Sequence, residues 1–183
     1  MLLGIVLFCL GYPEQALARS KAAIAEARRL VHPPSLAASL TIGTRLLSPD
    51  GDNAALDERA NELYAVATEH GFSQWHAEGT IYRGWVKVEN GDVAEGISLL
   101  RDGLAAFRAA GSEAWLPHFI ALLAAACGIA GQIREAVVQL DDALQITERT
   151  GERWIAAELN RHKGRLLLTQ GDAEAAENFY RKP

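Results

Sequence analysis

Glycine recurs at a fixed interval of 40 residues, and this period restricts the possible folds more than any other feature of the chain. A first series of glycines lies in one register, and a second series lies midway between its members. The first comprises Gly11, Gly51, Gly91, Gly131 and Gly171, and the second comprises Gly71, Gly111 and Gly151. Because glycine readily takes the left-handed conformation that ends a helix, the two series predict two helices in each unit.

The residues between the glycines have helical spacing. Val137, Leu140 and Leu144, for example, form one apolar stripe at i, i+3 and i+7. A hairpin of two such helices cannot bury its apolar face alone, so stacked hairpins are expected. The predicted helices are 2–10, 13–31, 35–47, 53–70, 73–90, 93–110, 114–130, 133–150, 153–170 and 173–181.

Capping and turn residues support these helix ends. Asp92, with Glu95 three residues later, has the spacing of a capping box. Two prolines after His32 replace the glycine that would separate the first two units, and they would stop one helix and start the next. Residues 48–52, Ser-Pro-Asp-Gly-Asp, predict a turn and the most irregular stretch of the chain.

Small residues distinguish between the helical solenoids with comparable periods. A 40-residue period falls in the HEAT and armadillo range, whereas tetratricopeptide repeats have 34 residues. Tetratricopeptide hairpins place one small residue in the middle of helix A and two small residues, seven apart, on helix B. Gly84 and Gly164 lie at the first position, and the pairs Ala16/Ala23, Gly96/Gly103 and Ala136/Ala143 lie at the second.

The sequence therefore predicts an all-α, right-handed α-solenoid of tetratricopeptide-like hairpins with longer helices than usual. We expect one continuous array over residues 1–183, because no low-complexity linker interrupts it. The first and last units are incomplete, and the expected units are 1–31, 35–70, 73–110, 114–150 and 153–183.

Composition excludes several classes of partner. The net charge is −5, so the chain lacks the basic surface expected for binding nucleic acid or an anionic membrane. Cys9 and Cys127 each lie in an apolar stretch, which favours two buried thiols in a reducing compartment, and hence the cytoplasm. The apolar run over residues 1–10 has no preceding basic residue and is too short to span a bilayer, so we expect a buried helix there.

Four stretches carry a resemblance to a known family: residues 10–20 (LGYPEQALARS), 80–85 (TIYRGW), 103–108 (GLAAFR) and 151–168 (GERWIAAELNRHKGRLLL). They resemble the C-terminal tetratricopeptide array of bacterial AAA-type ATPase and adenylate/guanylate cyclase proteins. That array is similar to the helical arrays of nucleotide-switch transcription activators. The resemblance covers essentially the whole chain and implies a binding or sensing role. Asn160 and His162 stand where the family has larger apolar or aromatic residues.

No catalytic residue carries over from that family, since the chain has no Gly-x-x-x-x-Gly-Lys-Ser/Thr motif and no cyclase aspartates in a matching context. Both ends fall within a predicted hairpin, which suggests a fragment or a detached tail of a larger regulator. Free-standing arrays end in polar capping helices. We therefore expect exposed apolar surface on the terminal helices, through which copies of the chain would associate.

Enzymatic and metal-binding patterns are missing from the sequence. The five histidines show no His-x-x-x-His spacing, and there is no Cys-x-x-Cys pair, so we expect no metal and no cofactor. Cys127 lies in the apolar centre of a helix, where a thiol is inert. The neighbouring Asp141 and Asp142 are expected on a solvated surface.

Candidate binding residues follow from the repeat geometry, because helix A of a tetratricopeptide hairpin faces the concave side. Mapping the family's groove positions onto this chain gives Arg45, Glu78, Trp85, His118, Arg161 and Arg165. Arg161 and Arg165, one turn apart, could hold a carboxylate or phosphate, or Arg161 could instead pair with Glu158. Trp85 could anchor a peptide or belong to the core. Trp75, Trp115 and Trp154 begin successive A helices and are expected to pack between units.

These observations predict a non-enzymatic scaffold that binds a protein or peptide, or transmits a signal to an ATPase or cyclase domain. Two alternatives remain open at this point. One is a small-ligand sensor that uses Arg161 and Arg165, and the other is a structural module that oligomerises through its terminal helices.

Overall fold

The computed structural model describes residues 2–48 and 51–182. This part of the chain is all-α and contains no strand. The helices are α1 (Leu2–Cys9), α2 (Pro13–Arg29), α3 (Pro33–Leu47), α4 (Asn53–His70), α5 (Ser73–Glu89), α6 (Val93–Ala109), α7 (Leu116–Ile129), α8 (Ile133–Thr150), the 3₁₀ helix η1 (Arg153–Ile155), α9 (Ala156–Thr169) and α10 (Ala173–Tyr180). Met1, Pro183 and the Pro49–Asp50 part of the predicted turn lie outside the described residues.

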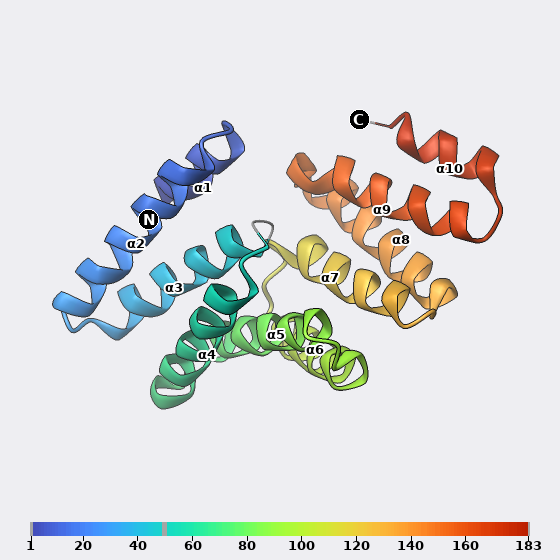
Figure 1. Ribbon diagram of the computed structural model, residues 1–183. Helices are drawn as coiled ribbons and strands as arrows, with labels where there is room; N and C mark the ends of the chain where they lie inside the picture. Colours follow the sequence, from blue (N-terminus) through green and yellow to red (C-terminus); the bar gives the residue numbers. More distant parts are fainter. Residues whose placement is uncertain (1, 49–50, 183) are drawn as a thin grey trace.

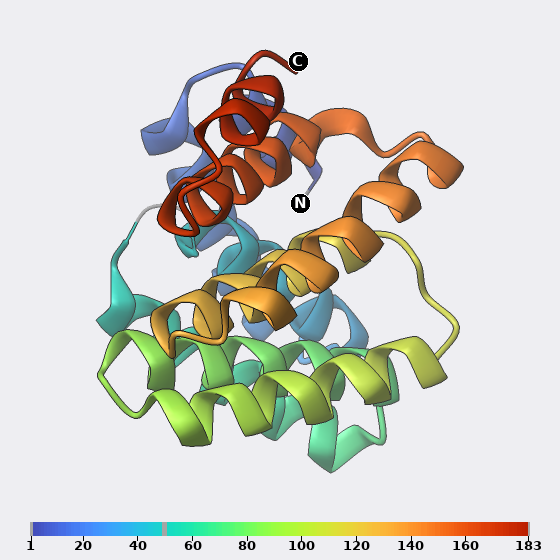
Figure 2. The same cartoon turned by 90° about the vertical axis from the view of Figure 1, so that its right-hand side faces the viewer.

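Consecutive helices pair into hairpins, and the hairpins stack into a solenoid, as the period predicts. We call the odd-numbered helices A helices and the even-numbered ones B helices. The solenoid bends into an arch, with the first hairpins in one arm, α9 and α10 in the other, and α5 and α6 at its base (Figure 1). In the view turned by 90°, the hairpins rise in layers from α5–α6 through α7–α8 to α9–α10 (Figure 2). Neighbouring A helices contact one another directly, which places them on the inner side.

The repeated glycines end the helices as predicted. All eight have positive φ, from +69° at Gly71 to +94° at Gly91. Val31 stands in the register of Gly71, Gly111 and Gly151, and it too has a positive φ, of 49°. The two prolines behind it begin α3, and the His32 ring accepts a hydrogen bond from the Ser35 amide. Val31 therefore adopts a backbone conformation that the other units give to glycine.

The predicted close helix crossings occur in the central hairpin. A Cβ atom added at Gly84 would lie 2.9 Å from the backbone oxygen of Gly96 and from the backbone nitrogen of Leu100. A Cβ atom added at Gly103 would likewise lie 3.0 Å from the backbone nitrogen of Ile81. A side chain at these positions would collide with backbone, so the glycines allow α5 and α6 to pack at this distance.

Two helix starts come later than predicted, and α3 begins at Pro33, two residues before its predicted start. The helix expected from residue 114 begins at Leu116, because Trp115 has φ = 70° and caps the helix from a left-handed conformation. The helix expected from Arg153 begins with the 3₁₀ turn η1, and α9 follows from Ala156. Both differences lie at the same place in the repeat, where an A helix follows an inter-repeat glycine.

The prediction of a buried N-terminal helix is wrong. In α1, Gly4 is buried, but Leu2, Leu3 and Val6 are more than half exposed. Cys9 is exposed as well, so the prediction of two buried thiols holds for Cys127 alone. The run is apolar around the whole helix, so its sequence has no polar face that would mark an exposed side. The sequence therefore could not show that neighbouring helices cover only one side of α1.

Two predicted local interactions also differ. The Asp92 side chain makes no cap hydrogen bond, because Lys87 Nζ lies 3.5 Å from its carboxylate and 3.1 Å from that of Glu95. Asp141 and Asp142 form ion pairs instead of facing only solvent: Asp141 pairs with Lys163, and Asp142 pairs with Arg108. In each case a lysine or arginine from another helix takes up the carboxylate.

The B helices are joined on the outer side by ion pairs between residues 34 positions apart. Arg28 pairs with Glu62 at 2.7 Å, Arg101 with Glu135 at 2.6 Å and Arg108 with Asp142 at 2.5 Å. Their side chains are 26–51% exposed, so each pair contributes less than about 1 kcal/mol. Among the helices described, none is both long and apolar enough to cross a membrane.

Candidate functional site

A buried ion pair joins α3 to α5 on the inner side of the arch. Both carboxylate oxygens of Glu78 accept hydrogen bonds of 2.9 Å from Arg45 Nη2. The Glu78 side chain is fully buried, and that of Arg45 is 10% exposed. Burial raises the pKa of Glu78, and the neighbouring Arg45 guanidinium opposes this rise. Arg45 Nε is buried without a hydrogen-bond partner, so the guanidinium keeps an unused donor.

Aromatic rings continue this pair towards α7 and η1. The Arg45 guanidinium carbon lies 4.3 Å from the centre of the Trp115 ring, and the Trp115 ring centre lies 4.6 Å from that of Trp154. The Glu152 carboxylate accepts hydrogen bonds from the Trp115 backbone amide, at 3.1 and 3.2 Å, and from Trp154 Nε1, at 2.7 Å. Side chains of α3 and α5, the residue that caps α7, and the segment that begins η1 are thus held in contact.

Trp115 occupies its place in this arrangement at an energetic cost. A left-handed conformation costs a residue with a side chain about 1–2 kcal/mol, and Trp115 has φ = 70°. The two hydrogen bonds from its amide to the Glu152 carboxylate, the tilted ring contact with Trp154 and the contact with Arg45 offset this cost. Strained backbone that is held by surrounding contacts is typical of functional sites.

Tyr82 and His118 complete the cluster. Tyr82 Oη lies 3.5 Å from His118 Nε2, and both rings pack against Phe119. Burial, together with the positive charge of Arg45, lowers the pKa of His118 to about 4. His118 is therefore neutral at physiological pH. We call Arg45, Glu78, Tyr82, Trp115, His118, Glu152 and Trp154 the inner cluster.

Three of the six predicted binding residues, Arg45, Glu78 and His118, belong to the inner cluster. The other three lie elsewhere. Trp85 is half-buried against the central core. Arg161 is exposed and pairs with Glu158 at 2.5 Å, the alternative that the sequence left open. Arg165 is exposed and forms neither a hydrogen bond nor an ion pair within the described chain.

Sequence reasoning missed Tyr82 and Glu152 as members of the cluster. Tyr82 is fully buried on α5, and its helical spacing alone marks it as an ordinary core residue. Glu152 directly follows the helix-ending Gly151, and nothing in its own helix signals a partner 37 residues earlier in the chain. The predicted role of Trp115 in packing between units agrees with its contact with Trp154, although Trp154 itself is 50% exposed.

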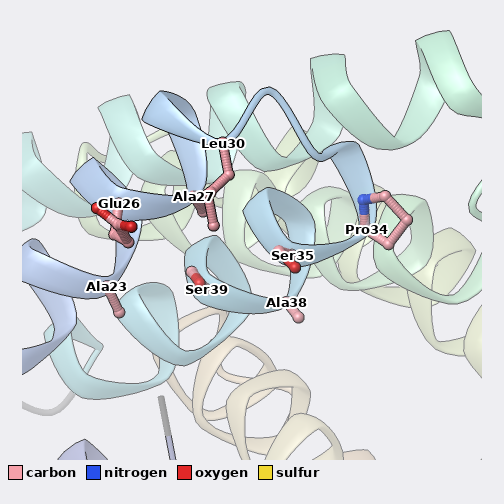
Figure 3. A pocket seen from close by; sticks show the side chains of 8 residues that line it. All are labelled: Ala23, Glu26, Ala27, Leu30, Pro34, Ser35, Ala38 and Ser39. Carbon is pink, nitrogen blue, oxygen red and sulfur yellow. The ribbon is translucent and has the colours of Figure 1, made fainter.

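Two pockets lie away from the inner cluster. A pocket of about 430 Å³ between α2 and α3 is lined by small and aliphatic side chains, with Glu26 as its one charged residue (Figure 3). Ala23 lines it and is half-buried, unlike the other small B-helix residues, which are buried in helix crossings. A second pocket, of about 470 Å³, contains the ion pairs of Arg108 and Arg149. Neither pocket gathers unpaired chemical groups.

Among the described residues, no group of three or more His, Cys, Asp or Glu side chains could hold a metal ion. The thiol of Cys127 is buried, and burial raises its pKa, so the thiolate form is disfavoured. Within the inner cluster, Glu78 and Tyr82 are fully buried, whereas Trp154 is 50% exposed.

Comparison with known proteins supports the fold. No protein-family profile matches the chain. It is 26% identical over 174 residues to the uncharacterized protein R02095 of Rhizobium meliloti (strain 1021). That match includes 95% of this chain and spans 17% of the length of the relative.

Solved structures of helical-repeat proteins superpose over 97% of the chain. One is the TPR-like repeats of a putative kinesin light chain from Podosopora anserina, with a TM-score of 0.62, 19% identity and 87% of that chain covered. Another is apo RapI, with a TM-score of 0.68, 10% identity and 78% of that chain covered. A third is Bacillus thuringiensis PlcR in complex with the peptide PapR7 and DNA, with a TM-score of 0.65, 16% identity and 67% of that chain covered. At these identities the likeness establishes a TPR-like solenoid fold. It does not carry over the ligands of those proteins.

Proposed function

We propose that this chain is a non-catalytic scaffold that binds a peptide segment of a partner protein along the inner side of the arch. The observation that carries the proposal is the inner cluster, in which A helices of three hairpins and a strained tryptophan are held together. Trp115 has φ = 70°, and strained backbone held by surrounding contacts occurs often at functional sites. The similar fold of PlcR, crystallised with a peptide, adds support.

The exposed edge of the inner cluster is the proposed point of contact. Trp154 is half exposed, while its indole N–H is fixed by Glu152, so its ring already has a defined orientation. Trp115 and His118 lie beside it, with ring centres 4.6 and 6.0 Å away. Preordered aromatic rings lose little conformational entropy on binding and dominate many interfaces.

Selection of binding peptides from a random library tests this proposal, with intrinsic tryptophan fluorescence as the readout. Trp154→Ala should weaken the binding of selected peptides at least about tenfold, which corresponds to roughly 1.4 kcal/mol. The melting temperature should stay within about 2 °C of wild type, because the ring is half exposed. Val138→Ala, an exposed position on α8, is the matched control and should leave affinity unchanged.

Equal affinity of wild type and Trp154→Ala for the selected peptides would contradict the inner side as the binding surface. Selection of no peptide, combined with a thermal shift by nucleotides, would favour the small-ligand sensor instead. In that experiment a ligand at 100 times its Kd should add about 2.7 kcal/mol to stability.

We also propose that the array serves within a larger regulator of the ATPase or cyclase type. The sequence resemblance supports this, as does the relative whose length is mostly outside the matching region. Sequencing the flanking reading frames would test the proposal: a P-loop or cyclase domain in frame is the expected result.

Self-association has one observation in its favour, the exposed face of α1. This helix has no charged residue, and Leu2, Leu3, Val6 and Leu10 are at least half exposed in and beside it. Sedimentation velocity of wild type and Val6→Glu tests the hypothesis that the chain is a structural module that oligomerises through its terminal helices. A dimer that Val6→Glu dissolves would support it, whereas a wild-type monomer at high concentration would exclude it.

A further inference from the structure

On the outer side, α2 and α4 are joined by one ion pair among the described residues, whereas α6 and α8 are joined by two. One of those two is the pair of Arg101 in α6 with Glu135 in α8. Two 40-residue periods earlier, the same positions are Lys21 in α2 and Ala55 in α4. Ala55 has no carboxylate, and the exposed side chain of Lys21 forms neither an ion pair nor a hydrogen bond within the described chain.

A second unpaired cation, Arg59, lies one helical turn beyond Ala55 on α4. Its side chain is half-buried, and it too forms neither an ion pair nor a hydrogen bond in the part of the chain that the structure describes. Its Nε atom is buried without a partner. A guanidinium has five N–H donors, and a buried donor that is left unsatisfied costs free energy.

Ser20 brings a buried hydroxyl to the same place. Ser20 Oγ lies 3.2 Å, and Arg59 Cδ lies 3.6 Å, from the point where a Cβ atom of Gly43 in α3 would stand. Ser20 is 4% exposed, and its Oγ has no hydrogen-bond partner among the described residues. Buried polar atoms normally have a partner, and here two helices each contribute a polar atom that the described chain leaves unsatisfied.

Two acidic side chains of α4 act on Arg28 instead. The hydrogen bonds that Arg28 donates to Glu62 do most to raise the pKa of Arg28, and the charge of Glu58 adds to this rise. Lys21 and Arg59 therefore keep two positive charges without a counter-charge among the residues described. We call Ser20, Lys21 and Arg59 the α2–α4 site.

The α2–α4 site faces solvent because it lies on the outer side of the solenoid. Arg101, which has the repeat position of Lys21, is 48% exposed although hairpins stack on both sides of its own. The hairpin of α3 and α4, against which the site is built, also has a neighbour on each side. Stacking of hairpins thus leaves this position open within the array.

We propose that the α2–α4 site binds a phosphate group. A phosphate monoester carries a charge of about −1.5 to −2 at neutral pH, which matches the two unpaired cations. Its oxygens are acceptors and suit the ammonium of Lys21, the guanidinium of Arg59 and the hydroxyl of Ser20, which are all donors. At Lys21 the phosphate would take the place that Glu135 takes at Arg101. The site is separate from the inner cluster, and its test does not depend on peptide binding there.

Nuclear magnetic resonance of the intact, isotope-labelled protein tests the proposal, because it detects backbone amides and the Arg59 Nε–H group. Inorganic phosphate and O-phosphoserine are titrated separately at constant ionic strength, so that general screening of charges does not change. The signals of the Lys21 amide and of Arg59 Nε–H should shift and saturate. Arg59→Gln, followed at the Lys21 amide, should weaken binding about tenfold, and Lys21→Gln, followed at Arg59, should do the same.

Ala55→Glu tests the site without removing a cation. It adds a carboxylate at the position from which Glu135 pairs with Arg101, so it should neutralise Lys21 and weaken phosphate binding about tenfold. Arg19→Gln is the matched control. Arg19 is exposed and unpaired within the described chain, and it lies two residues from Lys21, on another face of α2, so affinity should stay unchanged.

The absence of a saturable shift at about 10 mM of either ligand would overturn the proposal. Equal affinities of wild type and Arg59→Gln would overturn it too. So would a loss in Arg19→Gln as large as that in Lys21→Gln, since the attraction would then depend on overall charge alone. Tighter binding of O-phosphoserine than of inorganic phosphate would identify a phosphorylated side chain as the ligand, and the reverse order would identify free phosphate.

Discussion

The α3–α5 interface and the face of α9 place the same repeat positions in opposite environments. Glu78 and Glu158 are two periods apart, yet Glu78 is completely buried against Arg45, whereas Glu158 is 48% exposed beside Arg161. Accordingly, burial raises the pKa of Glu78, while the Arg161 hydrogen bond lowers the pKa of Glu158. The comparison shows that equivalent positions of a solenoid take their environments from the side chains that pack against them, and not from their own helix alone.

Substitution of Glu78 should have the largest effect and tests this comparison directly. Glu78→Ala would leave Arg45 buried and without its counter-charge, and such a loss costs about 3–5 kcal/mol. Chemical denaturation monitored by circular dichroism measures the change. Glu158→Ala, the matched change in α9, should cost less than about 1 kcal/mol because its pair with Arg161 is exposed. Similar losses in both variants would show that the two positions are energetically alike.

The pH dependence of stability should separate the inner cluster from the rest of the protein. His118 has a lowered pKa of about 4 in the folded state, compared with about 6.5 when unfolded. Between these values the unfolded chain binds a proton that the folded chain rejects, so stability should fall as the pH drops from 6.5 to 4, by roughly 3 kcal/mol.

The measurement is the free energy of unfolding of wild type minus that of His118→Gln across this pH range. The difference isolates His118 from Glu78, whose raised pKa acts in the opposite direction. A difference that does not vary with pH would show that His118 titrates normally and is not enclosed by the cluster.

A pair of glycine substitutions compares the central hairpin with the last one. Gly84→Ala forces a Cβ against the backbone of α6 and should destabilise by about 1–3 kcal/mol. In Gly164→Ala the new atom would meet the ring of Tyr180 at 2.8 Å, and that ring is half exposed and can turn aside. Its cost should therefore be smaller, and alanine's higher helix propensity offsets part of it. Thermal unfolding of both variants decides the point, and an equal loss would contradict the distinction.

Val31→Gly should change the free energy of unfolding least among these variants, and it should increase it. The other inter-repeat turns place glycine at this register, and the Val31 side chain is 85% exposed, so little packing is lost. Relief of the left-handed strain should add about 1 kcal/mol, or about 2–4 °C in melting temperature. A lower melting temperature would mean that the first junction depends on its valine.

Much of the fold could be predicted because glycine residues mark the helix ends in most of the repeats. A left-handed helix end favours glycine, so Gly71 and Gly151 mark their turns without reference to tertiary structure. The close crossing at Gly84 is similarly local, since a missing side chain in mid-helix favours close approach of another helix. These features depend on one residue and its own backbone.

The binding residues were less predictable because their partners lie one or two repeats away. Register alone placed Arg45 and Glu78 on the inner side, but it could not show that they neutralise each other. Register also predicted Trp85 and Arg165 as binding residues alongside Arg45. Trp85 instead packs against the core, and Arg165 is exposed without an ion pair among the described residues. The exposed α1 was mispredicted for the same reason, since its burial depends on what packs beside it.

The two arcs of the arch differ in how they are fastened. The inner arc is held by buried contacts that salt screens only weakly, whereas neighbouring B helices on the outer arc are bridged by partly exposed ion pairs between residues 34 positions apart. Raising the ionic strength should therefore loosen the outer arc first and reduce the resistance of the arch to bending about its inner side. The bending stiffness of the array would then depend on the salt concentration. Small-angle X-ray scattering would show this as a broader distribution of the radius of gyration at high salt.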